Sequence, residues 1–219
     1  MTLDKLWALI LFILNHEESG GVITPEQRNN LLSVAQQRYY SILYGEYERT
    51  QKISDSLSVF NHLGSISIDL NGLASLPTGY YHCGGISYLG NPVEIVTDSE
   101  YHYRLGSKLI KPTLKDPIAL FTNNQIQFQP VSLGNVLMSY LKYPIEPYYD
   151  WYMDSNYNEI FLPQGQVASG SIPASNTVEY QWRYEDKLKI VGIILDMCGI
   201  YLNNDKVIQY SKMFGAIER

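Results

Sequence analysis

The chain has 219 residues, of which 45% are hydrophobic and only 17% are charged, and its formal net charge is −6. This length is enough for one sizeable domain with a buried core. The negative balance, without a cluster of Lys and Arg, excludes a surface built to neutralise nucleic-acid phosphates. The 19 tyrosines, whose rings pack while their hydroxyls need polar partners, indicate extensive interfaces.

Cysteine spacing and hydropathy predict reduced thiols and no membrane span. Cys83 and Cys198 lie far apart and match neither a dense disulfide framework nor a paired zinc-binding spacing. The most apolar run, 6–14, is much shorter than the roughly 20 residues that a helix needs to cross a bilayer. The run also lacks the positive start and the small-residue cleavage site of a secretory signal.

Two helices are predicted near the start. Residues 2–15 carry apolar side chains around the whole circumference of a helix, which is typical of a helix buried on all sides. After a glycine break, Thr24, Pro25 and Gln27 provide an N-cap, a first-turn proline and a capping box. Apolar residues then recur every four positions and predict an amphipathic helix over about 25–49. Together these helices would form a helical hairpin.

From about residue 65 the apolar period changes to two, which indicates β-strands. Turn formers separate the alternating runs, so the segment predicts a small antiparallel sheet or sandwich. IALF and QIQF are expected to pair as a hairpin across the connection at 122–124. The predicted strands are ISIDL, YYHCGGISYL, VEIVT, IALF, QIQFQP and NVLMSYLKY.

The last third of the chain combines a loop with helices. Residues 152–176 are rich in Ser, Asn, Gly, Gln and Pro and predict an extended loop. A strand is predicted at 177–182, followed by a helix that opens on the acidic pair Glu185 and Asp186. A short strand and a last helix at about 204–214 complete the chain.

The predicted fold class is α+β, with an N-terminal helical hairpin, a central small antiparallel β-sheet or sandwich, and C-terminal helices. Its parts are the hairpin at 1–52, the β core at 53–151, the extended loop at 152–176, and a strand plus helices at 177–219. No stretch has the composition of a linker between independent domains. These parts are therefore expected to form one structural unit.

No residue pattern predicts a metal site, a cofactor site or a nucleophilic catalytic centre. His82 lies next to Cys83, but neighbouring side chains on a strand point to opposite faces, so the two cannot form a catalytic pair. Gly84 and Gly85 lack the lysine and the helix start of a phosphate-binding loop. The other histidines lie in no recognised metal spacing and are interpreted as surface or turn residues: His16, His62 and His102.

Two acidic residues support an alternative prediction of an enzyme. Asp98 and Glu100 would share one side of a strand, so paired acid and base work, as in glycoside hydrolysis, is conceivable. In such enzymes, however, the two carboxylates generally come from different elements around a cleft. TDSEYHY is more simply interpreted as a solvated turn that leads into a strand. The chain is therefore predicted not to be an enzyme.

The stretch YLKYPIEPYYDW, residues 140–151, combines prolines with aromatic residues. PIEP matches a minimal polyproline-recognition pattern, and the aromatic rings could stack on sugars. Each proline also removes a backbone donor, so Pro144 and Pro147 are expected to end a strand with a stiff, extended exit. Together with these prolines and Trp7, the aromatic residues of the stretch are the predicted packing or interface residues: Tyr140, Tyr143, Tyr148, Tyr149 and Trp151.

Several motifs, in their order along the chain, resemble a family of virion proteins of tailed bacteriophages that infect Bacteroidetes, including the crAss-like phages. The likeness lies in FILNHEESGGVITPEQRNNLLSVAQQRYY near the start, in LPTGYYH, SKLIKPTLKDPIALF and QIQFQP leading into NVLMSYLKYPIEPYYDW, and in VEYQWRYEDKLKIVGIILDMCGIYLNNDKVIQY near the end. The loop at 153–176 is longer than the family pattern, so no function of that loop carries over.

The resemblance implies a ring protein of the portal, neck or tail, a head-to-tail connector that stacks below the portal and lines the DNA conduit. The expected assembly is a homo-oligomeric ring, twelvefold as in the family, with the portal protein and other ring or tail proteins as partners. Phage DNA would pass through the conduit without specific binding. A negatively charged conduit wall would repel the DNA phosphates and let the DNA slide. The protein would be made in the host cytoplasm and reside in the virion. The alternative is a carbohydrate-binding or glycoside-cleaving tail component.

Overall fold

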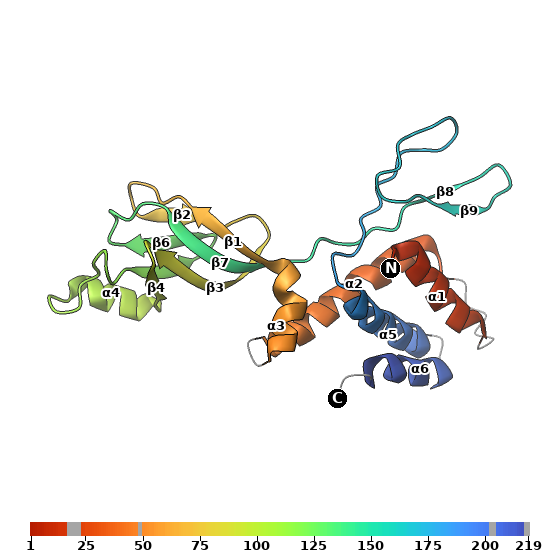
Figure 1. Ribbon diagram of the computed structural model, residues 1–219, viewed down its shortest axis with the longest axis horizontal. Helices are drawn as coiled ribbons and strands as arrows, with labels where there is room; N and C mark the ends of the chain where they lie inside the picture. Colours follow the sequence, from red (N-terminus) through yellow and green to blue (C-terminus); the bar gives the residue numbers. More distant parts are fainter. Residues whose placement is uncertain (17–22, 48–49, 202–204, 217–219) are drawn as a thin grey trace. The chain divides into compact units, whose positions relative to one another are not determined.

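The computed structural model describes residues 1–16, 23–47, 50–201 and 205–216, and the chain divides into two compact units. Met1–Val59 and Pro144–Arg219 form the first, called here the helical unit, and Phe60–Tyr143 form the second, called the sheet unit. Figure 1 shows most of the helices in the helical unit and most of the strands in the sheet unit. We describe each unit by itself.

The first helix of the helical unit, α1 (Leu3–His16), is buried on one face only. Leu6, Trp7 and Ile10 are buried, whereas Phe12 is 67% exposed. The prediction of burial on all sides is therefore wrong. α1 packs against the C-terminal helix α5 (Tyr184–Tyr201), and its opposite face, which carries Phe12, is exposed.

The second helix, α2 (Pro25–Gly45), begins as predicted with a capping box. The Thr24 hydroxyl oxygen accepts a hydrogen bond from the Gln27 backbone N–H at 3.3 Å, and the Gln27 side-chain oxygen accepts one from the Thr24 N–H at 2.9 Å. α2 ends at Gly45, earlier than predicted. A further short helix, α3 (Gln51–Leu57), begins after its own N-cap and leads into the 3-10 turn η1 (Ser58–Phe60).

The rest of the helical unit contains a small hairpin and two helices. Strands β8 (Trp151–Met153) and β9 (Glu159–Phe161) pair antiparallel inside the predicted loop. α5 is followed by α6 (Asp205–Ala216), which packs against it. The short strand predicted between them is wrong, since α5 continues to Tyr201.

The strand predicted at 177–182 is also wrong. This segment is extended and buries Tyr180 and Trp182, as its alternating pattern suggested. It forms only one isolated bridge, between Val178 and Tyr148. Its buried side chains pack against α2 and not against a sheet.

The sheet unit contains a mixed sheet of seven strands in the order β1-β7-β3-β4-β5-β6-β2. This large, curled sheet dominates the α+β fold, so the expected small antiparallel sheet or sandwich with flanking helices is wrong. The paired strands run antiparallel except β4 and β5, which are parallel. The strands are β1 (Asn61–Ile66), β2 (Leu73–Ser75), β3 (Tyr80–Tyr88), β4 (Asn91–Ile95), β5 (Ile118–Thr122), β6 (Gln125–Gln129) and β7 (Val136–Lys142).

The parallel pair is possible because helix α4 (Asp98–Gly106) lies in the connection between β4 and β5. Parallel strands need a long crossover, usually helical, whereas antiparallel strands can be joined by a tight turn. The segment TDSEYHY was expected to be a turn and strand, but it forms the N-cap and first turns of this helix. Tyr101 of α4 packs on Ile118 and Leu120 of β5.

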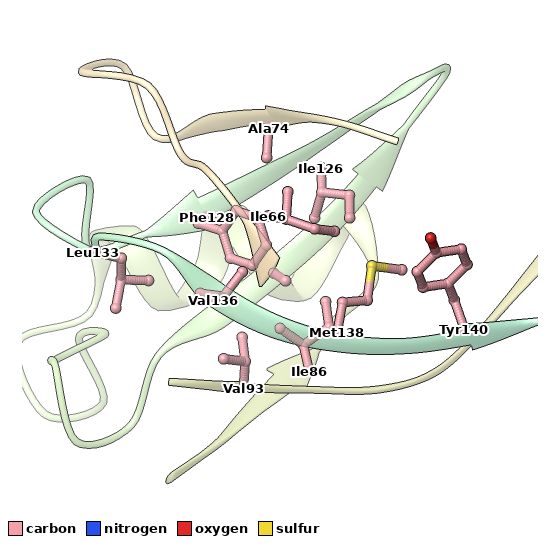
Figure 2. Packing of buried hydrophobic residues seen from close by; sticks show 11 residues of the cluster. Ile66, Ala74, Ile86, Val93, Ile126, Phe128, Leu133, Val136, Met138 and Tyr140 are labelled. Atoms are coloured by element: carbon pink, nitrogen blue, oxygen red, sulfur yellow. The ribbon is translucent and has the colours of Figure 1, made fainter. Parts of the chain in front are cut away.

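The sheet curls around one hydrophobic core. Figure 2 shows side chains from β1, β2, β3, β4, β6 and β7 converging on a common interior. Ile66 of β1 and Ala74 of β2 both belong to this core although their strands lie at opposite ends of the strand order. The two ends of the sheet are therefore brought close to each other by the curl.

Candidate functional site

The stretch of predicted interface residues begins inside the sheet unit. Tyr140 in β7 is only 7% exposed, and its ring lies 6.3 Å from that of Tyr80. Tyr143, just after the strand, is 57% exposed, with its ring 4.5 Å from that of Tyr81. β7 ends at Lys142, before the first proline of the stretch. Tyr140 is thus a core residue, while Tyr143 is displayed on the surface.

In the helical unit the stretch is fixed to α2 along one side. The Asn29 side chain donates a hydrogen bond to the Tyr149 carbonyl at 3.1 Å and accepts one from the Tyr149 N–H at 2.7 Å. The Gln36 side chain donates to the Ile145 carbonyl at 2.9 Å. Pro147 and Tyr149 are buried, whereas Ile145 and Tyr148 are exposed. The remaining predicted residues are half-buried: Pro144 at the start of the exit and Trp151 at the start of β8.

A buried arginine ties Tyr149 to the first helix. The Arg28 guanidinium lies 5.8 Å from the centre of the Trp7 ring and 5.6 Å from that of Tyr149, and it forms an ion pair with Glu159 of β9. The Arg28 side chain is only 11% exposed. Burial raises the pKa of the Tyr149 hydroxyl above its usual value. Trp7 and Tyr149 therefore pack within their own subunit.

The same face of α2 also holds the segment that precedes α5. The Tyr180 hydroxyl donates to the Leu32 carbonyl at 2.8 Å, and the Trp182 indole N–H donates to the Gln36 side-chain oxygen at 3.2 Å. One turn further on, the Tyr39 hydroxyl donates to the buried carboxylate of Asp186 at 2.7 Å. These bonds give the hydroxyls of Tyr180 and Tyr39 and the indole N–H of Trp182 the partners that buried polar groups require.

Asn29, Gln36 and Arg28 were not singled out by sequence reasoning. Asn29 and Gln36 are seven residues apart, which places both on one face of a helix. That face also carries the buried Leu32 and Tyr39. Polar residues at apolar positions of an amphipathic helix are a signal of buried hydrogen-bonding partners, and this signal could have identified the pair.

The two carboxylates considered for catalysis lie on α4, so their expected placement on a strand is wrong. Successive residues on a helix point in different directions, and residues two apart do not share a face. Arg104 donates to both Glu100, at 2.6 Å, and Glu94, at 2.6 Å. Asp98 lies 3.6 Å from the His102 ring nitrogen, and both side chains are exposed. The geometry is that of surface ion pairing.

The remaining sequence candidates are distributed over the sheet unit. Cys83 on β3 packs against the sheet's core, and burial raises the pKa of its thiol. His62 on β1 has its ring 6.1 Å from that of Tyr140. The side chain of His16 lies outside the described residues. Among the described residues, no group of three His, Cys, Asp or Glu side chains is placed to hold a metal ion.

A hollow in the sheet unit lies where the curl brings β1 and β2 together. It has a volume of about 470 Å³. Ser65 and Ile66 of β1 line one side, Ala74 and Ser75 of β2 line the other, and Tyr140 also contributes. We call β1, β2 and this cavity the seam. No sequence motif indicated it, because it arises from strand order.

Neither a known protein-family model nor a curated protein matches this chain. In the part of the chain that the structure describes, no helix has both the length and the apolar character needed to span a membrane. The fold and the surfaces above define an α+β protein with a curled mixed sheet, an open seam, and an aromatic segment after β7 that Asn29 and Gln36 hold by hydrogen bonds.

Proposed function

We propose that the chain is a structural subunit of a homo-oligomeric ring in the portal, neck or tail connector of a tailed bacteriophage. The ring would be twelvefold, line the DNA conduit and contact the portal protein or another ring or tail protein. The proposal starts from the ordered motifs that resemble this family. It places the protein in the virion and assigns it no catalytic activity.

One structural observation favours an interface role. Ile145 and Tyr148 are 56% and 43% exposed, although they lie on a segment whose backbone is held by Asn29 and Gln36. A held segment loses little conformational freedom when a partner covers it, so its exposed apolar side chains contribute more to binding. A ring subunit needs such surfaces, because each copy must contact two neighbours.

The geometry gives no support to the catalytic part of the carbohydrate alternative. It depended on Asp98 and Glu100 sharing one side of a strand, and they lie on a helix with Glu100 bound to Arg104. The aromatic residues of the stretch that are buried, Tyr140 and Tyr149, have no exposed face to stack on a sugar. We therefore propose no second function.

The test is a measurement of assembly. Sedimentation and electron microscopy of the purified chain, alone and mixed with a portal protein of the same phage, should show rings or recruitment to the portal. Ile145→Ser combined with Tyr148→Ser should weaken assembly without lowering the melting temperature. The matched control is Leu109→Ser, since Leu109 is 96% exposed and lies outside the segment. A chain that stays monomeric, ignores the portal and binds or cleaves surface polysaccharide would contradict the proposal.

A further inference from the structure

The seam leaves two strand edges open toward the same cavity. β1 pairs with β7 and β2 pairs with β6, and within the described residues these end strands form no ladder with each other. They are joined only at the turn between them, where the Asp69 N–H donates to the Leu73 carbonyl at 2.8 Å. Residues of both strands line the cavity, Ile66 from β1 and Ala74 from β2 among them.

β1 lacks the features that protect an edge strand. Its six residues, Asn61–Ile66, include no Lys, Arg, Asp, Glu or Pro. Its register with β7 runs from Asn61 to Ile66 without a bulge, and Leu63 is 68% exposed. Folded proteins usually protect an edge with charges, proline, bulges or very short strands, because an open edge can pair with another chain. The outer edge of β1 therefore carries none of the usual protecting features.

Small residues on both strands let another backbone approach part of the cavity. Gly64 and Ser65 lie on the β1 side, and Ala74 and Ser75 lie on the β2 side, among larger lining residues such as Ile68 and Leu73. An open strand edge, with its main-chain donors and acceptors, recognises an extended peptide by strand addition. The ligand chemistry that fits is thus an extended polypeptide.

The chain itself contains an uncharged hairpin loop in the helical unit. Residues 163–176, called here the arm, form a narrow hairpin in which the N–H groups of Ser169 and Ile172 each donate to the other residue's carbonyl at 3.0 Å. The Ser175 N–H donates to the Gln166 carbonyl at 2.9 Å and holds the base. The arm has no charged residue, and Val167 is 75% exposed. An exposed, uncharged segment of this kind fits an open strand edge that carries no charge.

We propose that the arm of one copy of this chain adds as a strand to the seam of a second copy. The proposal rests on the homo-oligomeric assembly proposed above and names one contact within it. The contact is heterologous, since the arm of each copy meets the seam of another copy, and such contacts generate rings when the rotation closes. Main-chain hydrogen bonds to β1 supply the affinity, while Val167 packs against the apolar side chains of the seam.

Disulfide trapping between copies tests this contact. Ser67 follows β1 and lines the cavity. A Ser67→Cys chain is mixed with a Val167→Cys chain and oxidised, and cross-linked peptides are identified by mass spectrometry. Each chain carries one new cysteine, so a product that joins the two sites joins two copies. The matched control replaces Val167→Cys with Tyr157→Cys, because Tyr157 is 88% exposed near the tip of the β8–β9 hairpin. A disulfide needs Cα atoms within about 7 Å, so only the arm variant should cross-link.

A charge variant gives an independent readout. Val167→Asp should weaken self-association by about tenfold or more, because a carboxylate would be buried without a partner. Tyr157→Asp should leave self-association unchanged. If rings form but the two mixtures cross-link equally, or if Val167→Asp assembles normally, the seam proposal fails and the ring proposal stands, with another occupant or none in the seam. A chain that remains monomeric and ignores the portal overturns both.

Discussion

Asn29 and Tyr149 are joined by two hydrogen bonds, in which one side-chain amide satisfies both the N–H and the carbonyl of a single residue. An asparagine side chain has a donor and an acceptor on adjacent atoms, and these can pair with a backbone N–H and carbonyl as a neighbouring strand would. α2 thus replaces a strand partner for the segment that follows β7. This contact explains how the segment around Tyr149 keeps a defined position although it belongs to no β-ladder.

Asn29→Ala should destabilise the helical unit by about 2 kcal/mol, because it leaves two backbone groups of Tyr149 without partners in a partly buried place. Urea denaturation should show the loss, and hydrogen exchange of a peptide spanning 144–152 should speed up locally. Asn30→Ala is the control, since Asn30 is the exposed neighbour on the same helix. Equal effects of the two substitutions would show that the contact adds nothing to stability.

Glu159→Gln should destabilise the helical unit by about 3 kcal/mol, at the low end for a broken buried pair. The side chains of Arg28 and Glu159 are 11% and 24% exposed, so the substitution leaves a largely buried guanidinium without its counter-charge. Glu146→Gln, at an exposed position of the same unit, should change stability little. The measurement is the free energy of unfolding in urea. A neutral Glu159→Gln variant would mean that water solvates Arg28 in the folded state.

The stability of the helical unit should fall as the pH rises above about 9. Burial raises the pKa of the Cys198 thiol from 9.0 to about 11, so the unfolded chain loses this proton before the folded chain does. The folded state therefore loses on the order of 2 kcal/mol between pH 9 and pH 11. Burial also raises the pKa of the Tyr180 hydroxyl, which continues the decline. Urea denaturation at several pH values should give a shallower slope for Cys198→Ala than for the unaltered chain, and identical slopes would refute the assignment.

The helix boundaries could be predicted where the signal is local. Thr24 and Gln27 cap α2 as expected, because a capping box depends only on residues three apart. The strands β3, β5, β6 and β7 also lie within the runs predicted to be strands, although burial alternates clearly only in β6 and in most of β7. Their order in the sheet does not follow from pattern, because alternation says which face is buried and not which strand is the neighbour.

The largest error came from one unrecognised helix. Residues 98–106 look like a polar turn, yet Tyr101 packs on β5 and Arg104 bridges Glu94 and Glu100. Without that helix the sequence predicts an antiparallel sheet, because no helical crossover is available for a parallel pair. It also places Asp98 and Glu100 on a strand. The seam could not be predicted for the same reason. β1 and β2 can be recognised as facing edges only when the whole strand order is known.

Asp98→Asn combined with Glu100→Gln should leave assembly intact and lower stability by less than about 1 kcal/mol, because exposed ion pairs contribute little. Arg104 keeps its two bonds to Glu94 in this variant. Sedimentation and thermal denaturation measure both properties. Loss of a polysaccharide-cleaving activity in the double variant would instead support the glycosidase hypothesis.

Gly72→Ala should destabilise the sheet unit by about 3 kcal/mol, since it combines backbone strain with a clash. Gly72 has a φ of +80°, and a Cβ there would lie 2.7 Å from the carbonyl oxygen of Phe128. The Gly72 carbonyl also accepts a hydrogen bond from the Phe128 N–H, so the turn cannot move away without losing this bond.

Gly90→Ala is the control that separates backbone strain from the steric clash. Gly90 has a φ of +87° with open space around a Cβ, so its loss should be only about 1 kcal/mol from strain. Urea denaturation of both variants measures the difference, and equal losses would show that the close approach of Gly72 to β6 does not hold the turn between β1 and β2.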